Sequence, residues 1–135
     1  MDCIFCKIAK GEIPCQKLYE DSDFIAFLDI HPSNKGHLLL VPKQHFSGLL
    51  DMPENVSAKI LATAKKVAAA AVKGLGADGF NLTQNNGSAA GQVVMHFHFH
   101  IIPRFKDDGL RNWPPKKTSD AELNEVAGRI RKNLG

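Results

Sequence analysis

Three histidines alternate with apolar residues in the segment His96-Phe97-His98-Phe99-His100-Ile101-Ile102. Successive side chains of a β-strand point to opposite faces, so this alternation predicts a strand with one imidazole face and one apolar face, its histidines about 7 Å apart. Valine or isoleucine would fill a buried strand face better than histidine, which changes charge near neutral pH. The segment therefore predicts a strand whose imidazole face lines a reactive cleft.

The rest of the chain switches between strand-like and helix-like stretches without the regular order of a parallel sheet, which predicts an α+β fold. A short helix is expected at residues 4–10, a long helix from Asp51 to Gly74, and a C-terminal helix from about Asp120. The intervening residues 103–118, which include Trp113, are expected to be ordered but irregular. Five strands are expected, at residues 17–20, 24–29, 37–41, 80–83 and 93–102.

The composition fits one soluble domain that spans residues 1–135. Hydrophobic residues make up 44% of the chain and charged residues 23%, which excludes disordered, collagen-like and disulfide-scaffold classes. The densest basic patches, residues 116–117 and 129–132, are typical of solvated surface, so no nucleic-acid partner is expected despite the net charge of +3. The start of the chain lacks a signal-peptide pattern, and no segment reaches the ~18 apolar residues of a membrane span, so a cytoplasmic protein is expected.

The loop before the histidine run, residues 84–92, is rich in asparagine, glycine, serine and alanine. Small residues let the backbone approach an anion closely, and Asn85 and Gln92 add amide donors. A plain hairpin loop would have the same composition. Beside three histidines, the interpretation as a phosphate cradle is favoured.

Two chemistries would use such a set of residues. Imidazoles at alternate positions of a strand could bind a catalytic zinc ion, with a third ligand from elsewhere, and activate water. Alternatively, a neutral histidine attacks phosphorus itself and forms a covalent intermediate that water then hydrolyses. The neighbouring phosphate cradle favours direct attack by histidine.

The chain has three cysteines, Cys3, Cys6 and Cys15. An odd number argues against a secreted disulfide framework and fits a reducing compartment. The Cys3-x-x-Cys6 pair could be a redox pair, a zinc half-site or incidental, but a redox pair normally follows a strand, and nothing upstream can form one. Cys15 is expected to be a free thiol, and His31 a solvated turn residue.

The histidine run matches the His-φ-His-φ-His-φ-φ signature, in which φ is apolar, of the histidine triad superfamily of nucleotide-binding proteins. The chain resembles its histidine triad nucleotide-binding branch, also called the protein kinase C inhibitor-like branch, and especially the bacterial-type members with an amino-terminal Cys-x-x-Cys. The resemblance implies a HIT-like fold and a homodimer in which each protomer contributes a five-stranded antiparallel sheet. It extends over most of the chain, through residues 4–5, 27–30, 37–43, 85–92 and 113–115.

This resemblance also implies a function. It implies hydrolysis of nucleoside 5′-phosphoramidates or related purine nucleotides at the α-phosphorus, through a nucleotidyl-histidine intermediate and with no cofactor required for the chemistry. His98 is implied as the nucleophile, supported by His100 and His37. Asp29 is implied to hold the ribose hydroxyls. The other implied contacts are to the phosphate, from Asn85, Gly91, Gln92 and Val93, and to the base, from Phe5, Ile8, Ile13, Phe27 and Ile30.

A structural zinc site is implied as well, with Cys3, Cys6, His45 and His96 as its ligands. Closed four-ligand zinc sites stabilise folds rather than activate water. Val93 stands where some relatives have a serine near the leaving group, so no hydroxyl contact is implied there. A dinucleoside polyphosphate hydrolase and a nucleotide-binding regulatory protein with vestigial catalysis remain alternative functions on the same scaffold.

Overall fold

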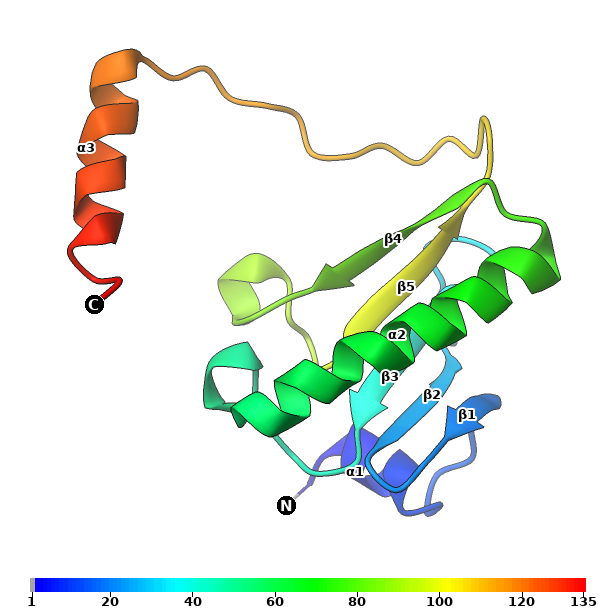
Figure 1. The fold of residues 1–135 in the computed structure, drawn as a ribbon. Helices are drawn as coiled ribbons and strands as arrows, with labels where there is room; N and C mark the ends of the chain where they lie inside the picture. The colour runs from blue at the N-terminus through cyan, green and yellow to red at the C-terminus, as the bar shows by residue number, and fades with distance from the viewer. Residues whose placement is uncertain (1) are drawn as a thin grey trace.

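The structure, a computed structural model, describes residues 2–135, and its body is one antiparallel sheet (Figure 1). The strands are β1 (Lys17–Glu20), β2 (Phe24–Leu28), β3 (Leu38–Pro42), β4 (Gly79–Gln84) and β5 (Phe99–Arg104). Their order in the sheet is β1-β2-β3-β5-β4, and every neighbouring pair is antiparallel. The helices are α1 (Ile4–Ala9), α2 (Glu54–Leu75) and α3 (Asp120–Arg131). The predicted α+β class, with one long and one C-terminal helix, is confirmed.

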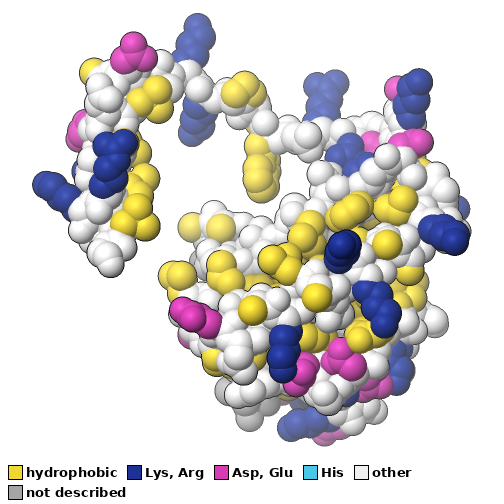
Figure 2. Space-filling model, in the orientation of Figure 1, with side chains coloured by type: hydrophobic (Ala, Val, Ile, Leu, Met, Phe, Trp, Pro, Cys, Tyr) yellow, Lys and Arg dark blue, Asp and Glu magenta, His cyan; other side chains and the backbone are white. Residues whose placement is uncertain are grey.

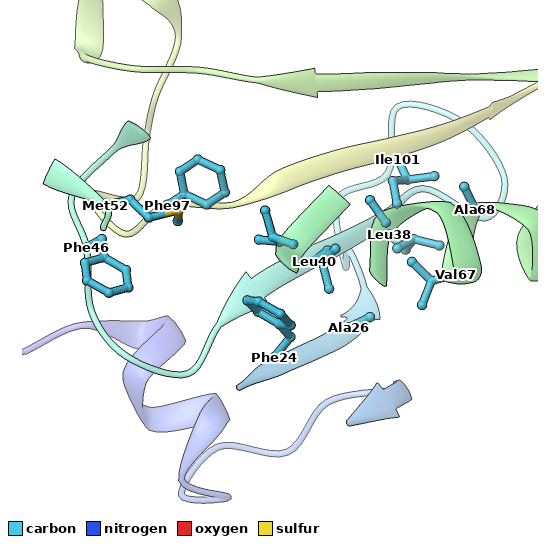
Figure 3. Close-up of a cluster of buried hydrophobic side chains, with 12 residues drawn as sticks. Phe24, Ala26, Leu38, Leu40, Phe46, Met52, Val67, Ala68, Phe97 and Ile101 are labelled. Carbon is cyan, nitrogen blue, oxygen red and sulfur yellow. The ribbon is translucent and has the colours of Figure 1, made fainter. Parts of the chain in front are cut away.

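Helix α2 covers one face of the sheet (Figure 1). It buries Ile60, Ala64 and Val67 at helical spacing, together with Ala68, and the small alanines let the helix lie close to the strands. Large apolar side chains of the strands and of the segment before β5 complete this core, and burying each contributes roughly 1.5–3 kcal/mol. Figure 3 shows the cluster, which includes Phe24, Leu38, Leu40, Phe97 and Ile101.

The opposite face of the sheet carries a second apolar cluster beneath α1. Phe5 and Ile8 of α1 pack there with Phe27 of β2 and Leu39 of β3. His100 lies on this same face, because it is the direct cross-strand partner of Leu39. The sheet therefore separates the α2 core from the face that carries the histidines.

The histidine strand is shorter than predicted, because β5 begins at Phe99 rather than at residue 93. Strands β3 and β4 both make their last pairing with β5 at Phe99, so residues 93–98 have no neighbouring strand to bond with. The prediction that His96 and His98 lie on one regular strand with His100 was therefore wrong. Tertiary contacts, rather than strand pairing, hold these two histidines.

Helix α2 is displaced from its predicted bounds, because it runs from Glu54 to Leu75 rather than from Asp51 to Gly74. The Asp51 carboxylate accepts hydrogen bonds from the backbone N–H groups of Ser47 (3.0 Å) and Gly48 (2.8 Å), so it caps the preceding 3-10 turn instead of α2. Gly76, at φ 64°, supplies the left-handed residue that ends α2.

The predicted irregular segment is present at residues 105–119. It begins two residues later than predicted, because Pro103 and Arg104 still belong to β5. Trp113 in this segment is 87% exposed. The segment carries α3 away from the sheet (Figure 1), and none of the residues of α3 is buried. Figure 2 shows apolar side chains gathered along α3, where Val126 and Ile130 are exposed, and Leu134 just after the helix is exposed as well. Within residues 2–135, no helix combines the length and apolar character needed to cross a membrane.

Candidate functional site

Three imidazoles lie together on the face of the sheet opposite α2. The ring centroids of His98 and His100 are 4.8 Å apart, and those of His37 and His100 are 5.2 Å apart. His100 belongs to β5, whereas His37 lies just before β3 and His98 just before β5. Phe5 of α1 lies edge-on against His98, with centroids 5.0 Å apart. The fold thus brings together all three histidines that the sequence indicated as catalytic.

Hydrogen bonds fix which nitrogen of each neutral ring carries the proton. The Nδ1 atom of His98 lies 2.7 Å from the carbonyl oxygen of His96, which can only accept, so Nδ1 is protonated and the lone pair is on Nε2. The backbone N–H of Ser33 donates to His37 Nδ1 (2.9 Å), which places the His37 proton on Nε2. The Nε2–H group of His37 in turn donates to His100 Nδ1 (2.9 Å), so the proton of neutral His100 is on Nε2. The free nitrogens of the two rings therefore differ: Nε2 of His98 carries a lone pair, whereas Nε2 of His100 carries a proton and is a hydrogen-bond donor.

Burial keeps these rings neutral. It lowers the pKa of His98 and of His37 below the ordinary value of 6.5, and Asp29 partly opposes the shift in both. The pKa of His100 falls to about 4, because burial and the neighbouring His98 and His37 all disfavour its charged form. At pH 7 the cluster thus consists of neutral imidazoles, as a nitrogen nucleophile requires.

Asp29 lies at the edge of this cluster. One carboxylate oxygen accepts a hydrogen bond from the backbone N–H of His31 (2.8 Å), and the other lies 3.6 Å from His37 Nε2. The apolar residues indicated for the base divide into two sets. Phe5, Ile8 and Phe27 are buried, whereas Ile13 is partly exposed and Ile30 is 84% exposed.

The loop between β4 and β5 bends through two glycines with positive φ, Gly87 (88°) and Gly91 (89°). The buried Gln92 side chain donates to the backbone oxygens of Ser47 (2.7 Å) and Val94 (3.0 Å) and accepts from Gly87 N–H (2.8 Å). Both amide hydrogens of Gln92 are therefore used to shape the loop, and the backbone N–H groups of Ala90, Gly91 and Gln92 also donate to carbonyl oxygens within it. Asn85, rather than Gln92, offers its side-chain amide to an anion.

A second cluster consists of four side chains that could bind a metal ion. Their ligand atoms lie within 4.8 Å of one another and come from Cys3, Cys6, His45 and His96. His96 Nε2 donates to the carbonyl oxygen of Pro42 (2.8 Å), so its Nδ1 lone pair faces Cys3 Sγ at 3.4 Å and Cys6 Sγ at 3.5 Å. Ligand separations of about 3.3–3.8 Å are those of a tetrahedral zinc site. This cluster is therefore able to bind a metal ion.

This cluster is linked to the candidate nucleophile, because the carbonyl oxygen of His96 accepts a hydrogen bond from Nδ1 of His98. A second set of ligand-type residues, Asp29, His37 and His100, also lies close together. The hydrogen bond between His37 and His100 uses one nitrogen of each ring. This arrangement favours proton-linked imidazoles over a metal site there.

Two backbone groups that set this chemistry have no sequence signal. The Ser33 N–H fixes the His37 tautomer, and the Pro42 carbonyl fixes that of His96. Because every residue other than proline has a backbone N–H and every residue has a carbonyl, only the fold reveals which ones meet an imidazole.

Comparison with known proteins agrees with the fold. The HIT domain family matches residues 10–107. An adenosine 5′-monophosphoramidase of Schizosaccharomyces pombe is 44% identical over 132 residues, which cover 96% of this chain and 96% of the relative. The crystal structure of a Streptococcus mutans protein superposes with a TM-score of 0.94 at 41% identity, over 99% of this chain and 86% of that chain. A zinc-bound histidine triad family protein of Mycobacterium smegmatis superposes with a TM-score of 0.78 at 38% identity, over 98% and 97%.

The family match covers most of the chain, and these relatives align along nearly all of it. The chain therefore belongs to the HIT domain family. Its place within that family is the histidine triad nucleotide-binding branch. The fold and the branch indicated by the histidine signature are thus confirmed.

Proposed function

We propose that this protein is a purine nucleotide-binding hydrolase that cleaves nucleoside 5′-phosphoramidates or related nucleotides at the α-phosphorus. The observation that carries the proposal is the tautomer of His98, whose bond from Nδ1 to the His96 carbonyl leaves a lone pair on Nε2. A neutral, oriented lone pair is what attack on phosphorus requires. The adenosine 5′-monophosphoramidase relative, at 44% identity, supports a phosphoramidate substrate.

The reaction has two displacements. His98 Nε2 forms a bond to the α-phosphorus while the bond from phosphorus to the leaving nitrogen breaks, and the leaving nitrogen takes a proton from solvent and departs as an amine. Water then attacks the phosphorus and gives a proton back to solvent, while the bond from phosphorus to Nε2 breaks, which releases the nucleoside monophosphate and restores the imidazole. His100 Nε2–H, supported by His37, donates to the nonbridging oxygens as negative charge develops on them.

The nucleotide is proposed to lie across the face that carries these histidines. Its phosphate contacts Asn85, Gly91 and the loop around Gln92 and Val93, where small residues let an anion approach the backbone closely. Asp29 accepts hydrogen bonds from the ribose hydroxyls. The base contacts the apolar residues Phe5 and Ile8 of α1 together with Ile13, Phe27 and Ile30.

Substitution of the nucleophile tests the reaction. His98→Asn is expected to abolish turnover of adenosine 5′-phosphoramidate while AMP binding persists, because asparagine cannot form the covalent intermediate. His31→Asn is the matched control, since His31 is exposed and outside the cluster. Mass spectrometry of acid-sensitive adducts should find AMP on His98 in the native protein. Full activity of His98→Asn would refute the proposal.

The same assay separates the alternative functions. Faster turnover of diadenosine polyphosphates than of the phosphoramidate would identify a dinucleoside polyphosphate hydrolase. Tight nucleotide binding without turnover of any substrate would identify a regulatory protein.

We further propose that the metal cluster holds a structural zinc ion. Two thiolates and two imidazoles are a preferred zinc ligand set, and the Mycobacterium smegmatis relative is zinc-bound. When bound, zinc would crosslink α1 to the segments that carry His45 and His96. Within residues 2–135 the three cysteines form no disulfide, and the location proposed for the protein is a reducing, cytoplasmic one. Chelation is expected to lower the melting temperature; loss of turnover from a chelated protein that stays folded would instead favour a catalytic zinc.

A homodimer is proposed as the functional assembly. Helix α3 has 12 residues, and an isolated helix of this length is marginal in water unless its apolar face packs against something. The S. mutans superposition, at a TM-score of 0.94 over 99% of this chain, supports the same displaced place for α3 in a crystal structure. A second copy of the chain is the partner proposed to cover Val126 and Ile130.

Light scattering after size-exclusion chromatography tests the assembly. Ile130→Glu is expected to shift the full chain toward the monomer mass, because it places a charge on the apolar face of α3. Arg131→Glu is the matched control, since it introduces the same residue at the next position of α3, where the native side chain is polar. A dimer mass for both variants would refute the role of α3.

A further inference from the structure

A nearly buried carboxylate lies outside the histidine cluster, just after β5. The side chain of Asp108 is 8% exposed. Its carboxylate accepts hydrogen bonds from Nε (2.8 Å) and Nη2 (3.0 Å) of Arg104. The backbone N–H groups of Phe105 and Leu110 each donate to it at 3.0 Å. The Arg104 guanidinium, with these backbone donors, holds the pKa of Asp108 well below its usual range. The carboxylate is therefore a fixed anion that organises the turn at residues 105–110.

Asn34 brings the loop before β3 to this anion. Its Nδ2 group donates to Asp108 Oδ2 (3.0 Å) and to the carbonyl oxygen of Pro103 (2.9 Å). Both partners are acceptors, so the orientation of the amide is unambiguous. Among the residues that the structure describes, these are the only hydrogen bonds from residues 31–36 to a distant part of the chain. We define Asn34, Arg104 and Asp108 as the Asn34 clasp.

The loop that the clasp holds is the one that orients His37. The carbonyl oxygen of Asn34 accepts the backbone N–H of His37 (3.1 Å), and the neighbouring Ser33 N–H donates to His37 Nδ1 (2.9 Å). That second bond keeps the proton of His37 on Nε2, where it donates to His100. The side chain of Asn34 and the ring of His37 are thus linked through one short turn.

We propose that Asn34 is a positioning residue for the reaction, acting through His37 on His100. The clasp fixes the turn, the turn places the Ser33 N–H on His37 Nδ1, and His37 Nε2–H then holds His100 with its own donor toward the phosphate. This inference rests on the proposed hydrolase function. It adds a residue that touches neither substrate nor any reacting atom.

Packing alone would not orient the loop in this way. Gly36 lies against Leu75 and Pro103, which anchors the loop near the end of β5. Apolar contact is non-directional, whereas the two hydrogen bonds of Asn34 set the rotation of the turn that carries Ser33. Losing the clasp should therefore disturb the His37 hydrogen bond while the loop stays packed.

Two substitutions of Asn34 test the proposal. Asn34→Asp keeps the size but replaces both donors with acceptors that face the Asp108 carboxylate and the Pro103 carbonyl. Asn34→Ala removes the amide without adding charge and serves if the aspartate variant does not fold. Lys35→Ala is the matched control, because Lys35 is exposed in the same loop and makes no hydrogen bond among residues 2–135.

The first measurement is the ¹⁵N-correlated NMR signal of the His37 Nε2 proton in the ligand-free full chain. Such imidazole protons are seen when a hydrogen bond protects them from exchange, so the signal should persist in the native protein and in Lys35→Ala and disappear in the Asn34 variants. The second is turnover of adenosine 5′-phosphoramidate. We expect kcat to fall about tenfold or more with KM changed less than twofold, because small misplacements of catalytic groups have effects of this size.

The outcomes are distinct. Folded Asn34 variants that keep the His37 signal and kcat, even with a lower melting temperature, would overturn the positioning role and leave Asn34 a structural residue. If the native protein turns over no phosphoramidate, the proposed function fails. The NMR signal still decides in that case whether the clasp holds His37.

Discussion

Acid should destabilise this protein through His100. Its pKa is about 4 in the folded state, against 6.5 for an ordinary histidine. Above pH 6.5 the ring is neutral in both states and contributes nothing to the pH dependence. Between pH 6.5 and 4 the unfolded state binds the proton and the folded state does not, so the free energy of unfolding falls as the pH falls, by about 1.4 kcal/mol per pH unit.

From pH 7 to pH 5 this single ring should therefore remove about 2 kcal/mol of stability, a large part of the 5–15 kcal/mol typical of a domain. The measurement is guanidinium unfolding at several pH values and one protein concentration. His100→Gln provides the comparison, because glutamine does not titrate and the other acid-sensitive groups, including the metal ligands, remain in both proteins.

The wild-type protein should lose about 2 kcal/mol more than His100→Gln between pH 7 and pH 5. Curves that fall in parallel would refute the argument, since they would show that His100 is accessible to protons in the folded state. Circular dichroism at pH 7 checks that the variant keeps the native fold.

Two further predictions concern packing. Ile60→Ala should lower the free energy of unfolding by roughly 2–5 kcal/mol, because Ile60 is 1% exposed between α2 and the sheet. Lys65→Ala, on the exposed side of α2, should change it by no more than about 0.5 kcal/mol. Equal losses in denaturant unfolding would contradict the packing argument. Gly36→Ala should lower the melting temperature, because Gly36 has φ 84° and a methyl group there would meet Leu75; an unchanged melting temperature would show that the loop adjusts freely.

Periodicity was the most informative signal in the sequence. Within residues 2–135 it predicted the five strands and the three α-helices, because burying one face imposes a repeat of two on strands and of about 3.6 on helices. Its errors fell at the ends of elements. The histidine alternation begins at His96, three residues before a partner strand is available at Phe99, and Asp51 caps the 3-10 turn that comes before α2 rather than α2 itself.

The candidate site was predictable in its side chains but not in its protonation. Histidine, asparagine and aspartate are rare enough in such patterns to stand out, and the structure brings His37, His98, His100 and Asp29 together. The tautomers depend on carbonyl and N–H groups that all residues share, so no pattern of residue types could indicate them. The Asn34 clasp joins residues 74 positions apart and likewise has no local signal.

The sequence by itself therefore determined the elements, apart from their ends, and the family, and it indicated the candidate reactive groups, since these follow from local periodicity and from a short, specific motif. Tertiary structure alone decided that His96 faces the cysteines while its carbonyl oxygen holds His98, and that His37 turns its proton toward His100. The physical reason is that a hydrogen bond depends on the distance and direction between groups far apart in the chain, which only the folded backbone sets.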